Sequence, residues 1–351
     1  MRKYYILFSI FLFLPSFKSI AFLSHGKDWL LDFKKEQILD SKLKFKGLLV
    51  GGLSGLAYDE RTNVFYVLSD AKKNYRLYKL ALRITPEYHF KILDQILLKD
   101  SKGNPLSRNM DPEDLVFYDE NTVFITSEGQ QIFKEHEPTS LFTFSLPSFS
   151  LKSVFPVAEM FWPKGEKKQK GNIGSQENKG FESLTLDRAS KSLWTSTEKA
   201  LFQDLKTERQ VVLRLSEFDI KNQKLISQYL YPLEDQKTGL TAMIFLKEKS
   251  FLTLERKFDV PFLSVELFFT DCNLSNDVKN QITLEKKNRF CSKKKIWSSS
   301  ELDFLVGNLE GMSLVEHSGK KILILVSDNN FKSFQKTHFL FFEISEKELK
   351  N

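Results

Sequence analysis

Acidic residues recur at matching places along this chain, at the ends of short β-hairpin patterns. In the clearest case Glu182 comes just before an alternating apolar and polar stretch, and Glu198 follows a second one after a polar turn. Such alternation is typical of strands. The two strands of a hairpin run antiparallel, so both carboxylates are predicted to lie at the same end of this hairpin.

The same pattern occurs five times. Its copies lie in residues 52–70, 111–128, 178–198, 239–256 and 308–330. Taking Gly52, Glu113, Glu182, Thr241 and Glu310 as anchors gives steps of 61, 69, 59 and 69 residues. Roughly regular self-similarity at this scale is typical of a repeat architecture, and further alternating stretches between the hairpins give each repeat about four strands.

These features predict an all-β fold, a single β-propeller of five or six four-stranded blades. Five hairpins are marked, and a further blade with a faded motif in residues 200–300 or near the N-terminus would make six. Residues 22–50 contain strand material of the kind that often completes the last blade of a closed ring.

A propeller would bring the acidic positions together, because the start of each first strand and the end of each second strand share one rim. The strand starts place Glu113, Glu182 and Glu310 on this rim. The strand ends place Asp70, Glu128, Glu198, Glu255 and Asp328 there, with Arg256, Asn308 and Asn329 beside them.

Carboxylates gathered in this way repel one another, so some must shift their pKa or bind a cation. Hard oxygen ligands suit Ca²⁺ or Mg²⁺, and the same groups are able to act as acid, base or substrate grip. Polar residues at hairpin ends also cap loops or hold neighbouring blades, which is the structural alternative for any one of them. We predict Ca²⁺ ligands at Asp70, Glu113, Glu128 and Glu198, catalytic roles for Glu182, Glu255 and Arg256, and ligand contacts from Asn308, Glu310, Asp328 and Asn329.

Other kinds of catalytic site have no matching motif. The segment 52–55, Gly-Leu-Ser-Gly, lacks the Gly-x-Ser-x-Gly pattern of a nucleophile elbow. None of the five histidines stands at a strand start or strand end of the hairpin motif, so a Ser-His-Asp triad has no evident histidine. Neither a phosphate-cradling glycine loop nor a zinc signature is present.

The composition of the 351 residues, 41% hydrophobic and 28% charged, is that of a globular protein. The formal net charge is +7, with basic runs at 164–170, 286–287 and 293–295 in predicted loops. Solvated loop charge is the preferred interpretation of these runs over nucleic-acid binding, and a contact with an anionic polymer or a cell surface stays open. We expect no nucleic-acid partner, a monomer, and a small ester or phosphoester as ligand.

The N-terminus has the pattern of a secretory signal peptide over residues 1–21. Arg2 and Lys3 form a basic start, residues 4–15 an apolar core, and Ser19 and Ala21 a small-residue cleavage point. An uncleaved membrane anchor is the alternative. With cleavage, residues 22–351 form the mature propeller domain, exported to the periplasm or the outside. No later segment is long and apolar enough to cross a bilayer.

The chain has two cysteines, Cys272 and Cys291. In an exported protein such a pair predicts one disulfide, with free thiols as the alternative. No histidine lies near either cysteine, so a zinc site is not expected.

The hairpin motifs, taken in order, resemble the phytase-like domain family, described as "esterase-like activity of phytase", from about residue 51 to 344. The resemblance is carried by Gly52–Leu56, Asp111–Glu113, Asn178–Glu182, Glu255–Arg256, and Asn308–Gly311 with Ser327–Asn330. Asp114 and Ser183 stand where the family often has Gly, and Thr241 replaces a Glu in the fourth hairpin. The resemblance implies an exported propeller and a hydrolase of ester or phosphoester bonds.

Two functions follow as hypotheses. The first is a metal-assisted hydrolase of a phosphate or carboxylate ester, in which Ca²⁺ polarises the ester and activates water while Arg256 grips the anion. The second is a non-catalytic exported propeller that binds a ligand or protein partner through the same mouth.

Overall fold

The computed structural model describes residues 27–84, 86–107, 109–132, 135–162, 173–205, 210–259, 262–317 and 319–348. Within these ranges the chain forms 24 strands and two short 3₁₀ helices, η1 (Glu159–Phe161) and η2 (Ser299–Glu301). The predicted signal peptide and the basic run 164–170 lie outside the described residues. No helix in the described part is long and apolar enough to cross a membrane.

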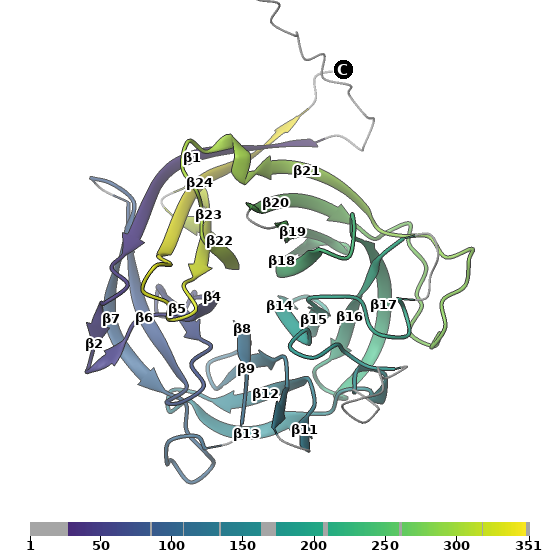
Figure 1. The fold of residues 1–351 in the computed structure, drawn as a ribbon, viewed down its shortest axis with the longest axis horizontal. Coiled ribbons are helices and arrows are strands. Elements are labelled where there is room, and N and C mark those ends of the chain that lie inside the picture. Colours follow the sequence, from purple (N-terminus) through teal and green to yellow (C-terminus); the bar gives the residue numbers. More distant parts are fainter. Residues whose placement is uncertain are drawn as a thin grey trace, which may run out of the picture.

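Twenty of the strands form five antiparallel four-stranded sheets, which are the blades of a propeller (Figure 1). The first blade contains β4 (Leu53–Asp59), β5 (Val64–Ser69), β6 (Arg76–Arg83) and β7 (His89–Leu97), and the second contains β8 (Pro112–Phe117), β9 (Thr122–Ser127), β12 (Ser140–Ser145) and β13 (Ser150–Phe155). The third contains β14 (Phe181–Asp187), β15 (Ser192–Thr197), β16 (Val212–Asp219) and β17 (Lys224–Pro232), and the fourth β18 (Thr238–Lys247), β19 (Ser250–Asp259), β20 (Phe262–Asp271) and β21 (Ser292–Ser298). The fifth contains β22 (Asn308–His317), β23 (Lys320–Asp328), β24 (Thr337–Glu348) and β1 (Lys27–Leu39). The predicted propeller is confirmed, with five blades.

The ring closes through the N-terminal strand. β1 pairs antiparallel with β24 and is the outermost strand of the last blade, as the sequence led us to expect. The strand material at residues 43–50 forms only a small separate sheet, β2 (Lys44–Phe45) with β3 (Leu48–Leu49), and β10 (Gln130–Ile132) pairs with β11 (Glu135–Glu137). The described part of residues 200–300 contributes only to the third and fourth blades.

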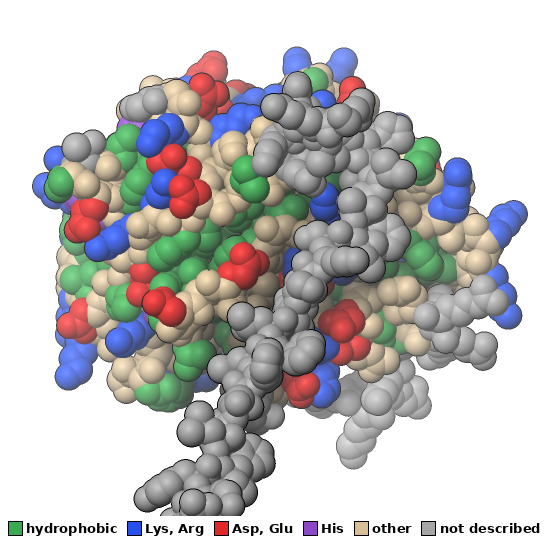
Figure 2. Space-filling view, turned by 90° about the horizontal axis from the view of Figure 1, so that it is seen from above, with side chains coloured by type: hydrophobic (Ala, Val, Ile, Leu, Met, Phe, Trp, Pro, Cys, Tyr) green, Lys and Arg blue, Asp and Glu red, His purple; other side chains and the backbone are tan. Residues whose placement is uncertain are grey.

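Aromatic side chains fill the layers between neighbouring blades, which explains the 33 phenylalanines of the chain. Between the first and last blades, Phe90 lies 4.9 Å from Phe65, 5.1 Å from Phe339 and 5.4 Å from Phe341, measured between ring centroids. These rings are buried, so their packing stabilises the closure that the β1–β24 pairing makes. On the outer side seen in Figure 2, acidic and basic side chains are interspersed.

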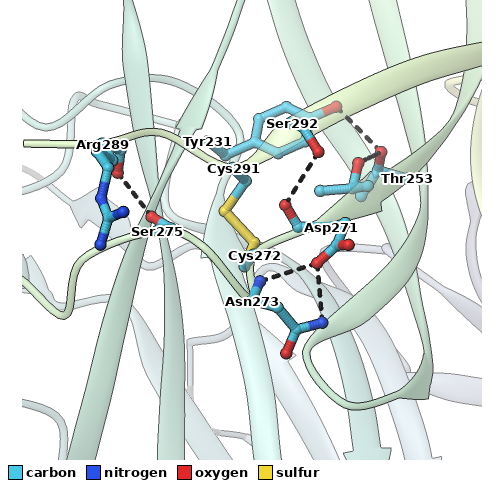
Figure 3. Close-up of a disulfide and its surroundings, with 10 residues drawn as sticks. Tyr231, Thr253, Asp271, Cys272, Asn273, Ser275, Arg289, Cys291 and Ser292 are labelled. Atoms are coloured by element: carbon cyan, nitrogen blue, oxygen red, sulfur yellow. Dashed lines mark hydrogen bonds between the residues drawn. A yellow bond between two sulfur atoms is a disulfide. The ribbon is translucent and has the colours of Figure 1, made fainter. Parts of the chain in front are cut away.

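Cys272 and Cys291 form the predicted disulfide, with an S–S distance of 2.02 Å. It joins the end of β20 to the segment before β21 (Figure 3). The insertion between the cysteines reaches the third blade, where the Val278 N–H donates to the Gln228 carbonyl at 2.8 Å. The buried Arg214 side chain donates to the Gln281 carbonyl at 2.8 Å and holds the same insertion. The disulfide therefore closes a segment that fastens two blades together.

Candidate functional site

A β-bulge lies at the same place in the innermost strand of every blade. The pairing between first and second strands shifts at Ser54–Gly55, Glu113–Asp114, Glu182, Thr241 and Glu310. A bulge leaves its extra residue out of the regular ladder and is common beside functional sites. This register makes Ser54, and not the expected anchor Gly52, the counterpart of Glu113.

The two hydroxyl residues at this position connect neighbouring blades. Ser54 Oγ donates to the Pro112 carbonyl of the second blade at 3.1 Å. Thr241 Oγ1 donates to the Leu309 carbonyl of the fifth blade at 3.2 Å. The bulge position thus has a glutamate in three blades. In the other two blades it has a hydroxyl side chain that forms a hydrogen bond to the next blade.

The ends of the second strands also follow one register, and it moves one predicted site residue. The residues that pair with the position just before each bulge are Ser69, Ser127, Thr197, Glu255 and Ser327, and the residues after them are Asp70, Glu128, Glu198, Arg256 and Asp328. Successive side chains of a strand point to opposite faces. Arg256, and not Glu255, therefore shares a face with the acids.

Glu255 is placed away from the predicted rim. Its Oε1 accepts hydrogen bonds from the Tyr231 hydroxyl at 2.5 Å and from Lys293 Nζ. Tyr231 belongs to β17 and Lys293 to β21, so the buried Glu255 carboxylate lies between the outer parts of the third and fourth blades. The expectation that Glu255 faces the same mouth as Glu182 is corrected here, because a one-residue step in a strand reverses the direction of the side chain.

The second and third blades bring five carboxylates together. Oxygen atoms of Asp111, Glu113 and Glu128 lie within 4.8 Å of one another, and so do oxygen atoms of Glu128, Glu182 and Glu198. We call these five residues the acid cluster. Of the predicted metal ligands, Glu113, Glu128 and Glu198 belong to it and Asp70 does not, while Glu182, predicted as catalytic, does.

Burial and mutual repulsion hold protons in the acid cluster. Burial, together with the charge of Glu182, raises the pKa of Glu113 well above its usual value. Burial and the charge of Glu128 do the same for the pKa of Glu182. The pKa of Glu128 rises to about 7, because burial and the charge of Glu198 outweigh a hydrogen bond with Glu182. A bound cation would ionise those carboxyls of the cluster that coordinate it.

Asp70 in the first blade and Asp328 in the fifth blade also have raised pKa values. Burial, with repulsion from Glu310, raises the pKa of Asp70 to about 7. Burial, with repulsion from Glu310 and Asp70, raises the pKa of Asp328 to about 9. Asp328 Oδ1 also accepts the Asn330 N–H at 2.7 Å, so one of its oxygens has a structural partner.

Three cations compensate part of this negative charge. Arg256 donates to Glu310 Oε1 at 2.5 Å, to Glu198 Oε1 at 3.2 Å and to Asn308 Oδ1. Lys179 Nζ forms an ion pair with Glu198, and Lys72 Nζ forms one with Asp111. Although burial acts against it, Arg256 and Lys179 lower the pKa of Glu198.

Asn329 is placed in a structural role. Its Oδ1 accepts the N–H of Gly52 at 3.0 Å and the N–H of Phe331 at 3.0 Å. It is 1% exposed, and its amide connects the last blade to the start of the first. The predicted ligand contact from Asn329 is therefore not carried forward.

The donor set of the acid cluster fits a hard divalent cation. Glu128 Oε1 is buried and has no hydrogen-bond partner among the described residues, and the same holds for Asp70 Oδ1 outside the cluster. A buried oxygen without a partner costs free energy that a bound cation would offset. The two overlapping groups of three carboxylates offer oxygen ligands of the kind that Ca²⁺ takes in proteins.

A cavity of about 820 Å³ adjoins the acid cluster on the side of the third, fourth and fifth blades. Its inner end is bordered by Glu198, Arg256, Asn308 and Asp328. Its walls include Lys179, Lys199, Lys237, Lys332 and Lys336. The excess of cations along the walls suits an anionic ligand, whose charged end would lie close to Glu198 and Arg256.

Comparison with known proteins supplies the family. The chain matches the Phytase-like model, described as "Esterase-like activity of phytase", over residues 48–331. This chain belongs to the phytase-like family. No curated protein matches it significantly.

Of the three similar solved structures described next, the first supports the fold of this phytase-like chain and nothing beyond the fold, and no argument is drawn from the other two. A GH43 β-1,3-galactosidase with galactodeoxynojirimycin is 8% identical, with a TM-score of 0.52, over 88% of this chain and 94% of that one. A PQQ-bound aldose sugar dehydrogenase from Streptomyces coelicolor is 9% identical, with a TM-score of 0.40, over 89% and 99%. A gluconolactonase from Xanthomonas campestris is 10% identical, with a TM-score of 0.37, over 92% and 99%.

Three residues at the site of this phytase-like chain were missed by sequence reasoning. Asp111 joins the acid cluster, and Lys72 and Lys179 pair with its members. Asp111 and Lys179 stand inside motif segments, 111–113 and 178–182, two residues before the selected Glu113 and three residues before the selected Glu182. The sequence feature that could have identified them is their position just before the start of a predicted strand. Lys72 follows Asp70 in a loop and carries no such signal.

Proposed function

We propose that this phytase-like protein is an exported, metal-assisted hydrolase of phosphate or carboxylate esters. The observation that carries the proposal is the junction of two oppositely charged regions. The acid cluster is suited to a divalent cation, the cavity walls are suited to an anion, and Glu198 belongs to both. Metal-assisted hydrolysis of an anionic ester needs this neighbourhood of cation site and anion site.

In this proposal Asp111, Glu113, Glu128 and Glu198 of the acid cluster hold Ca²⁺, with Mg²⁺ as the smaller alternative, and Glu182 keeps its proton. When bound, the cation would polarise the ester and lower the pKa of a coordinated water. Arg256 borders the cavity and keeps its orientation through Glu310 and Asn308, so it presents a fixed positive charge to the substrate. Lys179 fixes the Glu198 carboxylate between the two regions.

Glu182 is the residue we assign to proton handling. It is 5% exposed, and burial together with the charge of Glu128 raises its pKa well above the usual value. The carboxyl therefore stays protonated at pH values where an ordinary glutamate is ionised. A carboxyl of this kind is able to hold a proton near the leaving group at neutral pH. Glu255 has no part in the proposal, since its carboxylate is bonded to Tyr231 and Lys293.

The test is hydrolysis of aryl phosphates and short acyl esters, with Ca²⁺ and with a chelator. We expect Ca²⁺-dependent turnover that Glu182→Gln lowers by about a hundredfold or more, while Glu316→Gln, an exposed acid of β22, leaves it unchanged. Turnover that survives the chelator refutes the metal-assisted proposal. Tight Ca²⁺ binding without turnover of any ester would instead support a non-catalytic binding propeller.

Export is part of the same proposal and has its own test. The segment 1–21 supplies the signal, and the Cys272–Cys291 disulfide suits an oxidising compartment. We expect N-terminal sequencing of the protein recovered from the periplasm or medium to begin near residue 22. An intact Met1 on membrane-embedded protein would contradict export by cleavage.

A further inference from the structure

The mouth of the cavity gathers exposed apolar side chains. Leu305 is 93% exposed and Phe334 79%, and these are the two most exposed large hydrophobic residues in the described part of the chain. Phe258, 59% exposed, also lines the cavity. We call Phe258, Leu305 and Phe334 the apolar rim. Scattered single apolar residues are normal on a surface, but a cluster around a cavity marks a binding site.

The apolar rim is built from three separate segments. Phe258 lies near the end of β19, Leu305 between η2 and β22, and Phe334 between β23 and β24. The turn before Phe334 is fixed, because the Lys332 N–H donates to the Asn329 carbonyl at 2.8 Å. The three side chains therefore line one cavity because the fold of the fourth and fifth blades brings their segments to it.

Two exposed lysines lie beside the apolar rim. Lys332 and Lys336 are exposed on either side of Phe334, and Lys332 Nζ lies 5.9 Å from the centroid of its ring. Neither lysine forms an ion pair with a described residue. The inner end of the cavity has Arg256 and Glu198, so the cavity is charged inside and apolar, with cations, at its mouth.

We infer that the natural ligand is an amphiphilic phosphoester with a single alkyl or aryl group. Its phosphate lies at the inner end, near Arg256, and its apolar group lies against Leu305, Phe334 and Phe258. The assignment of the phosphate end rests on the proposed function, whereas the apolar end rests on the rim alone. A fully polar sugar or polyol phosphate would leave the rim uncovered.

The test compares two non-hydrolysable probes that differ only in the length of the chain, hexylphosphonate and methylphosphonate. Binding of each to the mature protein is measured by calorimetry with Ca²⁺ present. We expect hexylphosphonate to bind about tenfold more tightly or better, since burial of each additional CH₂ favours binding. Leu305→Ser with Phe334→Ser is expected to reduce the preference to about twofold, and Phe258→Ser alone to reduce it in part. Leu274→Ser, 77% exposed and outside the cavity lining, is the matched control.

Equal affinity for the two probes in the wild-type protein overturns the inference. So does binding to phosphatidylglycerol vesicles that depends on the rim without any preference for hexylphosphonate, which would assign the rim to a membrane surface. Because the assay needs no turnover, a protein that prefers hexylphosphonate and hydrolyses nothing keeps the inference and refutes the hydrolase. A protein that hydrolyses esters without this preference does the reverse.

Discussion

Glu128→Gln tests the acid cluster most directly, because Glu128 belongs to both groups of carboxylates. In the metal-free wild-type protein its pKa is raised from 4.5 to about 7 by burial and by Glu198. A raised carboxyl pKa means that the folded state binds more protons than the unfolded state between these two values. Stability is therefore lost as the pH rises from 4.5 to 7.

The size of this loss follows from the shift. At 1.36 kcal/mol per pKa unit, the change from 4.5 to about 7 corresponds to about 3 kcal/mol of stability at pH 8. Gln has the same shape and carries no charge, so Glu128→Gln is expected to be about 3 kcal/mol more stable than wild type at pH 8. For a chain of this length the difference is about 4–5 °C in Tm. At pH 4.5 or below the two proteins are expected to melt together.

Calcium is expected to change the difference in stability between wild type and Glu128→Gln. The variant lacks the carboxylate that the two groups of the acid cluster share. At a free Ca²⁺ concentration of about 100 times Kd, binding stabilises the wild-type protein by about 2.7 kcal/mol, which closes the gap at pH 8. The assay is a thermal melt at pH 4.5 and pH 8, each with chelator and with Ca²⁺, and with Glu316→Gln as control. A variant that is less stable than wild type at pH 8 with chelator would refute the reasoning, as would a gap independent of pH.

Two further changes test other parts of the structure. Arg256→Gln removes the cation that Glu198 and Glu310 share. The side chains of Arg256, Glu198 and Glu310 are 13%, 5% and 12% exposed, so we expect about 3 kcal/mol of destabilisation in metal-free protein at pH 8, measured by urea unfolding. The exposed Arg83→Gln serves as its control, and equal stability of both variants would contradict the pairing. Replacing Cys272 and Cys291 by Ser, 19 residues apart, is expected to cost about 3 kcal/mol. Reductant should then destabilise the wild-type protein and leave the variant unchanged, and a wild-type curve insensitive to reductant would count against this.

The blade architecture was predictable because each hairpin shows its own local sequence pattern. Each hairpin has alternating residues and an acidic end, and its repetition at about 60–70 residues leaves few folds other than a propeller. The number of blades was not fixed by this, because β20 and β21 are separated by the insertion closed by Cys272–Cys291. That insertion left room in the sequence for a sixth blade.

The register of individual residues was less accessible to sequence reasoning. In the fourth blade β18 and β19 have ten residues each, so the sequence gives no mark for where the inner part of the second strand ends. Glu255 and Arg256 are adjacent, and the pairing of Leu240 with Glu255 just before the bulge shows which of them matches the acids of the other blades. A bulge changes the count by one residue, which is enough to exchange the two faces of a strand.

The position of Arg256 explains why the charges are divided between two regions. If all five strand ends were acidic, repulsion would be spread evenly around the ring. With Arg256 in the fourth blade, the acids of the third and fifth blades, Glu198 and Glu310, are compensated. Asp111, Glu113 and Glu128 lie in the second blade, beyond the reach of Arg256 in the contacts described. The residual negative charge is thus concentrated between the second and third blades, whereas the cavity is lined by residues of the third, fourth and fifth blades. One substitution in a repeated position therefore accounts for an acidic region and a cavity with lysine-rich walls that adjoin each other, with Glu198 belonging to both.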